Sequence, residues 1–187
     1  IFEVPTGRIL GAQAIGKGNA DKRIDVIATM ITMNGTVEDL KELELTYSPM
    51  FSTAKDVVNM AALVATNILE NRFKQIHVDE VRALVEKDAY ILDVREVGEF
   101  ANGHIKNAVN IPLSELRERM NEIPKERTVY VHCRSAQRSY NAVMALLHNG
   151  YENVYNVSGS FLGICLYEYY NDQAKNREPI VTQYNFR

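Results

Sequence analysis

Cysteine is scarce in this chain of 187 residues, which contains only Cys133 and Cys165. Two cysteines without a regular spacing cannot build a disulfide framework or a cysteine-rich zinc site. The sequence therefore predicts no metal centre and indicates a protein of the reducing cytoplasm. Cys165 stands among Ile164, Leu166 and Tyr167, so we expect it to be a small buried core residue.

An excess of basic charge is also missing. The net charge is −3 and neither half of the chain is basic, so we expect no nucleic-acid partner. No apolar run is long enough to span a membrane and no secretory signal opens the sequence, so we expect no membrane association. With 46% hydrophobic and 24% charged residues, the composition is typical of a soluble chain that buries a core.

The segment around Cys133 is the most informative part of the sequence. An apolar run, residues 129–131, leads into this cysteine, a short loop of arginines and serines follows, and a helical pattern begins behind it. This arrangement places the thiol over the positive end of a helix, among main-chain N–H groups that can hold an anion. It predicts a thiolate near neutral pH and hence a nucleophile. The flanking arginines and serines disfavour the alternative, a buried structural cysteine at a strand end.

The spacing inside the loop distinguishes between two classes of enzyme that use a cysteine nucleophile in such a loop. Four residues separate Cys133 from Arg138, one fewer than in the C-x5-R loop of protein tyrosine phosphatases. The string C-R-S-A-Q-R-S resembles the signature C-R-S-G-x-R-S of rhodaneses, which are sulfurtransferases. The resemblance implies that the loop binds its anionic substrate through Arg134, Ser135, Ala136, Gln137, Arg138 and Ser139. Because Ala136 replaces a glycine, a positive φ at this position would strain the loop and lower the rate.

The resemblance to rhodaneses extends over residues 73–172. Residues 93–95 give the D-V-R motif, residues 99–112 match E-x-x-x-G-H-I-x-x-A-x-N-I-P, and residues 153–159 resemble a late strand with a glycine turn. The resemblance implies an α/β domain over residues 73–174, in which helices flank a central parallel sheet and the Cys133 loop lies at its carboxyl edge. Strands that alternate with helical patterns indicate the same fold class independently. Residues 175–187 are expected to form a C-terminal tail.

Several polar residues near the motifs are candidates for a supporting role. Asp93 and Arg95 are expected to tie a strand end to a neighbouring loop, and His104 to hydrogen-bond the backbone, with a direct catalytic role as the less favoured alternative for each. For Cys165, the alternative to a core residue is a thiol that resolves a sulfur adduct on Cys133.

Local patterns divide residues 73–187 into further elements. Ile76 and Val78 are expected in one short strand, with Asp79 as the N-cap of the next helix. The helix after the Cys133 loop is expected to end at Gly150.

The first 70 residues have a different pattern. Residues 1–4 and 8–15 flank a Pro-Thr-Gly turn and predict a β-hairpin. Helices are expected from Asp21 to Gly35, after a Thr36–Asp39 capping box, and after Asp56. A short strand is predicted at residues 45–47, and the polar segment 70–74 is the expected domain boundary.

This first part contains the motifs T-G-R-I-L-G-A-Q-A-I-G, D-K-R-I-D-V-I-A-T, T-V-E-D-L, L-T-Y-S-P and S-T-A-K-D-V-V-N-M-A. In these motifs it is similar to the C-terminal dimerisation domain of pyridine nucleotide–disulfide oxidoreductases, in the branch of coenzyme A-disulfide reductases and NADH oxidases. The resemblance implies a partial domain that pairs two subunits into a homodimer through residues 1–70. It also places Tyr47 near the partner's flavin, although a packed interface aromatic is the favoured interpretation, and Phe51 stands where relatives often carry tyrosine.

No cofactor is expected in this chain, because residues 16–21 lack the third glycine of a dinucleotide fingerprint and no βαβ pattern follows. The resemblance implies FAD, NAD(P)H and coenzyme A for a longer parent protein.

The leading hypothesis is a rhodanese-type sulfurtransferase that carries sulfane sulfur as a Cys133 persulfide, within a flavin-dependent reductase of coenzyme A disulfide, persulfide or polysulfide. Its partners would be small sulfane-sulfur donors and thiol acceptors. One alternative is a non-catalytic module that binds sulfur species or senses oxidation, with the activity residing in the flavoprotein. A phosphatase is disfavoured by the length of the loop.

Overall fold

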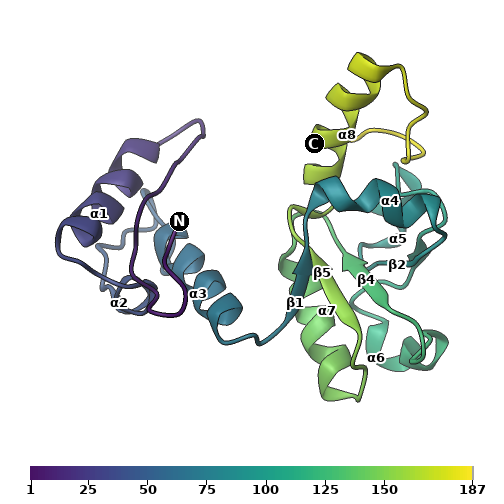
Figure 1. The fold of residues 1–187 in the computed structure, drawn as a ribbon, viewed down its shortest axis with the longest axis horizontal. Helices are drawn as coiled ribbons and strands as arrows, with labels where there is room; N and C mark the ends of the chain where they lie inside the picture. The colour runs from purple at the N-terminus through teal and green to yellow at the C-terminus, as the bar shows by residue number, and fades with distance from the viewer. Residues whose placement is uncertain (187) are drawn as a thin grey trace. The chain divides into compact units, whose positions relative to one another are not determined.

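The computed structural model describes residues 1–186 and divides the chain into two compact units (Figure 1). The first unit is Ile1–Arg72, and the second begins at Phe73. Among the described residues, no helix is long and apolar enough to cross a membrane.

The first unit consists of three helices joined by irregular backbone (Figure 1). The helices are α1 (Ala20–Thr32), α2 (Val37–Glu42) and α3 (Val57–Leu69). The predicted capping box is confirmed, since the Thr36 side chain accepts from the Asp39 N–H and the Asp39 carboxylate accepts from the Thr36 N–H. Asp56 caps α3 as expected by accepting a bond from the Val58 N–H at 3.1 Å. The expected hairpin is reduced to a single antiparallel bridge between Phe2 and Ile9.

The strand predicted at residues 45–47 is wrong, because this segment has no strand partner. The Asn59 side chain, from α3, donates to the carbonyl oxygens of Leu40 and Leu43, and the Ser52 hydroxyl donates to that of Thr46. Side chains therefore bind the Thr46 carbonyl and the carbonyls just before this segment, and the backbone is irregular.

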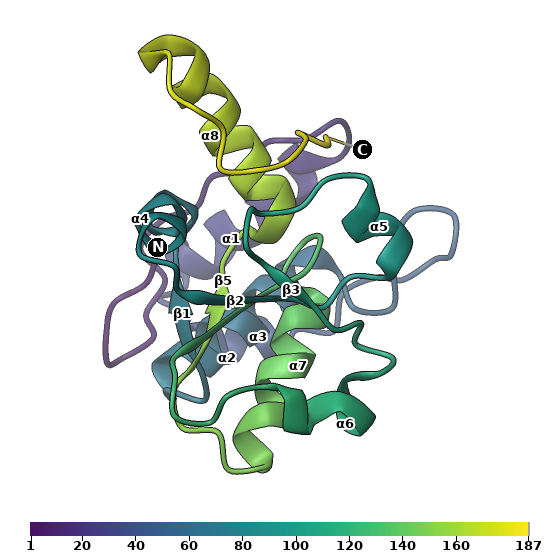
Figure 2. The same ribbon diagram turned by 90° about the vertical axis from the view of Figure 1, so that its right-hand side faces the viewer.

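The second unit contains a five-stranded, fully parallel sheet in the order β1-β5-β4-β2-β3. Its strands are β1 (Lys74–Ile76), β2 (Tyr90–Asp93), β3 (Val109–Asn110), β4 (Val129–His132) and β5 (Val154–Val157). Its α-helices are α4 (Val81–Glu86), α5 (Val97–Ala101), α6 (Leu116–Arg119), α7 (Gln137–His148) and α8 (Ser160–Lys175), with 3₁₀ turns at Val78–Glu80 and Met120–Glu122. Figure 2 shows α6 and α7 on one face of the sheet and α8 on the other. The predicted α/β class with helices on a parallel sheet is confirmed.

Two local predictions in this unit are wrong. Strand β1 ends at Ile76, so Val78 lies outside it, and Asp79 sits inside a 3₁₀ turn and caps no helix. The Glu80 carboxylate accepts from the His77 N–H at the start of that turn, which makes His77 the capping position.

The segment after α8 packs against the second unit. Ile180 and Val181 are buried in its core, and Val181 forms an antiparallel bridge with Ile105. Arg177 pairs with the buried carboxylates of Glu168 and Asp172 on α8. Residues 177–186 are therefore part of this unit's packing.

Candidate active site

The site forms where β2, β4 and β5 end at the carboxyl edge of the sheet. Strand β4 lies between the other two, so the residues that follow the three strands meet at this edge. They are Asp93 with Arg95 after β2, Cys133 after β4, and Ser160 after β5.

Cys133 is almost fully buried, with 1% of its surface exposed. Burial by itself raises the pKa of this thiol. Favourable interactions of the thiolate with the N–H and hydroxyl of Ser139, the N–H of Ser135 and the hydroxyl of Ser160 outweigh burial, so the pKa of Cys133 lies below its usual value. Of these groups, the Ser160 hydroxyl lies within hydrogen-bond distance of Sγ, at 3.9 Å. The predicted lowering of the pKa is confirmed, and the groups that lower it most are Ser135 in the loop, Ser139 in the first turn of α7 and Ser160 at the start of α8.

Ser160 is a site residue that the sequence motifs did not point to. Its hydroxyl lies 3.9 Å from Cys133 Sγ and accepts a bond from the Cys133 N–H at 3.1 Å. It is fully buried and lies 3.4 Å from the Ser139 hydroxyl. Ser160 follows Gly159 in the glycine turn after β5, and β5 lies beside β4, the strand that leads to Cys133; this position was the available signal.

Ala136 has a φ of +75°, in the left-handed region that favours glycine. The residue directly precedes α7, and the turn at this point aims the N–H groups of the loop inward. The loop thus requires the conformation in which alanine is strained.

The Arg138 guanidinium is held by Glu99 from α5. Its two terminal nitrogens donate to the two carboxylate oxygens at 2.6 and 2.7 Å. This bidentate bond holds the pKa of Glu99 below its usual range and raises that of Arg138. Arg138 is close enough to Cys133 for the two charges to interact, but its own charge is largely neutralised by Glu99.

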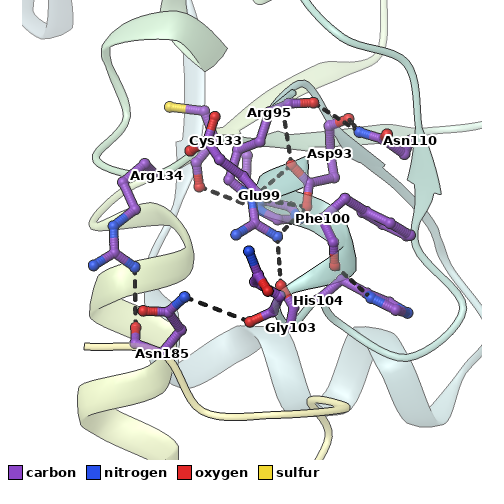
Figure 3. Close-up of polar contacts among 12 residues, drawn as sticks. Asp93, Arg95, Glu99, Phe100, Gly103, His104, Asn110, Cys133, Arg134 and Asn185 are labelled. Atoms are coloured by element: carbon purple, nitrogen blue, oxygen red, sulfur yellow. Dashed lines mark hydrogen bonds and ion pairs between the residues drawn. The ribbon is translucent and has the colours of Figure 1, made fainter. Parts of the chain in front are cut away.

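Arg134 extends from the loop toward the C-terminal segment (Figure 3). Its Nη1 donates to the main-chain carbonyl of Asn185 at 3.0 Å. The other predicted loop residue, Gln137, is exposed at the first position of α7. Within the loop, Ser135 and Ser139 thus interact with the Cys133 sulfur, whereas the side chains of Arg134 and Gln137 extend away from it.

Asp93 and Arg95 form a buried bidentate ion pair beneath the loop (Figure 3). Arg95 also donates to the Gly103 carbonyl at 2.9 Å, which ties the end of β2 to the turn after α5. His132, the last residue of β4, lies 3.6 Å from the Asp93 carboxylate, and its Nε2 has no hydrogen-bond partner among the described residues. Burial lowers the pKa of His132, which favours the neutral form of the ring. Asp93, Arg95 and His132 thus form a buried cluster of polar side chains at the sheet edge near Cys133.

His104 and Cys165 have the structural environments expected of them. His104 Nδ1 lies 2.9 Å from the Phe100 carbonyl, and its ring stacks on Phe100 (Figure 3). Cys165 is fully buried in the core of the second unit. Burial raises the pKa of the Cys165 thiol, and the Asn185 N–H and Arg134 only partly oppose this effect.

Tyr47 and Phe51 belong to the first unit and are not part of the Cys133 site. Tyr47 is exposed, and Phe51 lines a cavity of about 430 Å³. The other residues lining this cavity are Asn19, Lys22, Arg23, Val26, Leu45, Thr46, Ser52, Asp56 and Val58.

Comparisons with known proteins agree with this division. Residues 77–166 match the rhodanese-like domain, and residues 1–58 match the dimerisation domain of pyridine nucleotide-disulphide oxidoreductases. A sulfurtransferase of Allochromatium vinosum is 40% identical over 76 residues, which are 41% of this chain and 71% of that protein. The chain belongs to the rhodanese-like family. Its first unit is a dimerisation domain of the oxidoreductase type.

Two reductases are also similar to parts of this chain. The structure of an NAD-dependent persulfide reductase from A. fulgidus is 38% identical, with a TM-score of 0.76, over 86% of this rhodanese-like chain and 28% of the reductase. A coenzyme A disulfide reductase of Staphylococcus epidermidis is 44% identical over 59 residues, which are 32% of this chain and 14% of the reductase. The chain thus spans only a minor part of either reductase.

Proposed function

We propose that Cys133 is the nucleophile of a sulfurtransferase and carries sulfane sulfur as a persulfide. The observation that carries the proposal is the ring of donors around the Cys133 sulfur, formed by Ser135, Ser139 and Ser160, together with the lowered pKa of the thiol. A thiolate held in this way is a ready nucleophile, and the same donors can hold the negative charge of a persulfide.

In the first step, the Cys133 thiolate attacks the outer sulfur of a donor such as thiosulfate. A bond forms between Sγ and this sulfur while the sulfur–sulfur bond of the donor breaks, and sulfite leaves with the electron pair. In the second step, an acceptor thiolate or cyanide attacks the terminal sulfur of the persulfide, and the Cys133 thiolate leaves. The enzyme is restored without an external oxidant or reductant.

Mass spectrometry after incubation with thiosulfate tests this proposal. The peptide that contains Cys133 should gain the mass of one sulfur atom and lose it when cyanide is added. Cys165→Ser should behave like the wild type, whereas a label that appears on Cys165 alone would contradict the assignment. A stable adduct with no thiocyanate formed would favour the second candidate, a module that only binds sulfur species or senses oxidation. Hydrolysis of an aryl phosphate would favour a phosphatase instead.

We also propose that residues 1–70 pair two copies of the chain. Three apolar side chains of α3 are exposed in the single chain, namely Val57, Met60 and Val64. Such a stripe suits an interface between identical subunits. Sedimentation should find a dimer that Val64→Asp dissociates, and a monomeric fragment of residues 73–187 that still transfers sulfur. A dimer formed by that fragment would contradict the proposal.

We further propose that the chain is part of a longer flavin-dependent reductase, as its resemblance to the two reductases suggests. FAD and NAD(P)H would then belong to regions outside this sequence, Tyr47 would lie near the flavin of the partner, and coenzyme A would be the thiol acceptor. Discharge of the Cys133 persulfide by coenzyme A, followed by mass spectrometry, tests the last point. A persulfide that survives excess coenzyme A would contradict it.

A further inference from the structure

Arg134 belongs to the Cys133 loop, but the C-terminal segment holds its side chain. Its Nη1 donates to the Asn185 carbonyl at 3.0 Å, and no other acceptor within residues 1–186 bonds to it. A guanidinium carries five N–H donors, and Arg134 is partly exposed, so most of its donors remain available to an incoming anion. The groups that favour the Cys133 thiolate most strongly belong to Ser135, Ser139 and Ser160.

The position of Asn185 is itself fixed from two sides. Its side-chain amide donates to the Asn102 carbonyl, directly after α5, at 3.4 Å. The neighbouring Tyr184 donates to the buried Asp172 carboxylate. The rings of Tyr184 and Phe186 pack edge-on against Tyr169 of α8, with centroids at 5.3 and 5.4 Å.

Main-chain pairing fixes the register of the same segment. The Thr182 N–H donates to the His104 carbonyl at 2.8 Å. Gly103 has a φ of +120°, and a Cβ at this position would lie 2.5 Å from the Gln183 carbonyl oxygen. Glycine is therefore required for the segment to approach this closely. The contacts lock residues 182–186 to the turn after α5.

We propose that residues 182–186 position the Arg134 guanidinium as an anion-binding group at the entrance to the Cys133 loop. Asn185 is then a positioning residue that acts through Arg134. The segment gives the site its preference for negatively charged over uncharged reactants and leaves the thiolate itself unchanged. This inference rests on the proposed use of Cys133 as a nucleophile.

Alkylation of Cys133 by iodoacetate, an anion, and by iodoacetamide, its uncharged analogue, tests the inference. The ratio of the two rate constants reports the positive charge at the entrance. Tyr184→Ala with Asn185→Ala in the full chain should lower this ratio by about three- to tenfold, the size of one partly solvated charge interaction. Arg134→Gln should lower it equally, and the three substitutions together should lower it no further.

The pH profile of the iodoacetamide reaction separates positioning from general damage to the loop. It should be unchanged in these variants, whereas a disturbed loop would shift it. Glu178→Gln is the control. This substitution near the same C-terminal segment removes only an exposed ion pair with Lys106, so it should keep the wild-type ratio. If the double variant does not fold, as judged by circular dichroism, Tyr184→Phe must still lower the ratio, because it removes the bond to Asp172 that anchors the segment and keeps the ring.

An unchanged ratio in folded variants, or additive losses with Arg134→Gln, would overturn the inference. The readout does not require sulfur transfer. The ratio of alkylation rates can therefore be interpreted even if the persulfide assay fails. An unchanged ratio, in turn, would not contradict the role of Cys133 as sulfur carrier.

Discussion

The two cysteines of this chain are equally buried, but the pKa values of their thiols are shifted in opposite directions. Cys133 is 1% exposed and Cys165 is 0% exposed. Burial raises the pKa of both thiols, but for Cys133 the hydrogen bonds from serines outweigh it, whereas for Cys165 the Asn185 N–H and Arg134 do not. In our proposal, the polar groups near the sulfur, rather than exposure, separate the nucleophile Cys133 from the core residue Cys165.

The largest expected effect comes from the cysteines themselves. Cys133→Ser should reduce sulfur transfer by about a thousandfold or more, because no other group can carry the persulfide. Cys165→Ser should retain most of the activity, since Cys165 contributes packing alone. A thiosulfate:cyanide assay on both variants checks this, and comparable losses would remove the distinction between the two sites.

Loss of one hydrogen-bond donor should raise the pKa of Cys133, so that its thiol becomes more like that of Cys165. Ser160→Ala removes a hydroxyl 3.9 Å from Sγ, so the pKa of Cys133 should rise. Alkylation by iodoacetamide at pH 7 should slow by about tenfold, which corresponds to one hydrogen bond to a charged group. Ser158→Ala is the matched control, because this serine lies in the same turn and its hydroxyl makes no bond among the described residues. Equal rates in the two variants would contradict the role of Ser160.

Charge should matter less than hydrogen bonding at the thiolate. Arg138→Ala should slow the same alkylation by only about two- to threefold, because Glu99 already neutralises most of the charge of Arg138. Stopped-flow alkylation rates for Arg138→Ala and Ser160→Ala show which substitution slows the reaction more. A larger loss in Arg138→Ala would mean that charge dominates at this sulfur.

The smallest effect is expected at the strained turn. Ala136→Gly removes a Cβ at φ +75°, so it should raise the free energy of unfolding by about 1 kcal/mol or less, with the greater flexibility of glycine in the unfolded chain as an offset. Urea unfolding measures this. A destabilised Gly variant would show that alanine is not strained there.

Much of this site follows from sequence, because its main part is continuous in the chain. Residues 133–136 lie between β4 and α7, as predicted, and residues 137–139 form the first turn of α7, so adjacent residues encode the strand, the left-handed turn and the helix. The lowered pKa of the thiol could be expected from the same segment.

The parts that the sequence did not reveal depend on contacts between distant segments. Ser160 reaches Cys133 only because β5 lies beside β4, and Glu99 reaches Arg138 only because α5 packs next to the loop. The packing of residues 177–186 depends on buried carboxylates on α8. The strand predicted at residues 45–47 failed for a related reason, since a strand requires a partner that local propensity cannot supply.

The pH dependence of alkylation at both cysteines in one sample is the most direct test of the central claim. Because the pKa of Cys133 is lowered, its thiolate persists as the pH falls below about 8.5, the value of a free thiol, and iodoacetamide should label it below that pH. Cys165, whose pKa is raised, should stay unlabelled in the folded protein over the same range. Labelling of Cys133 that begins only at or above the pH of a free thiol would contradict the account.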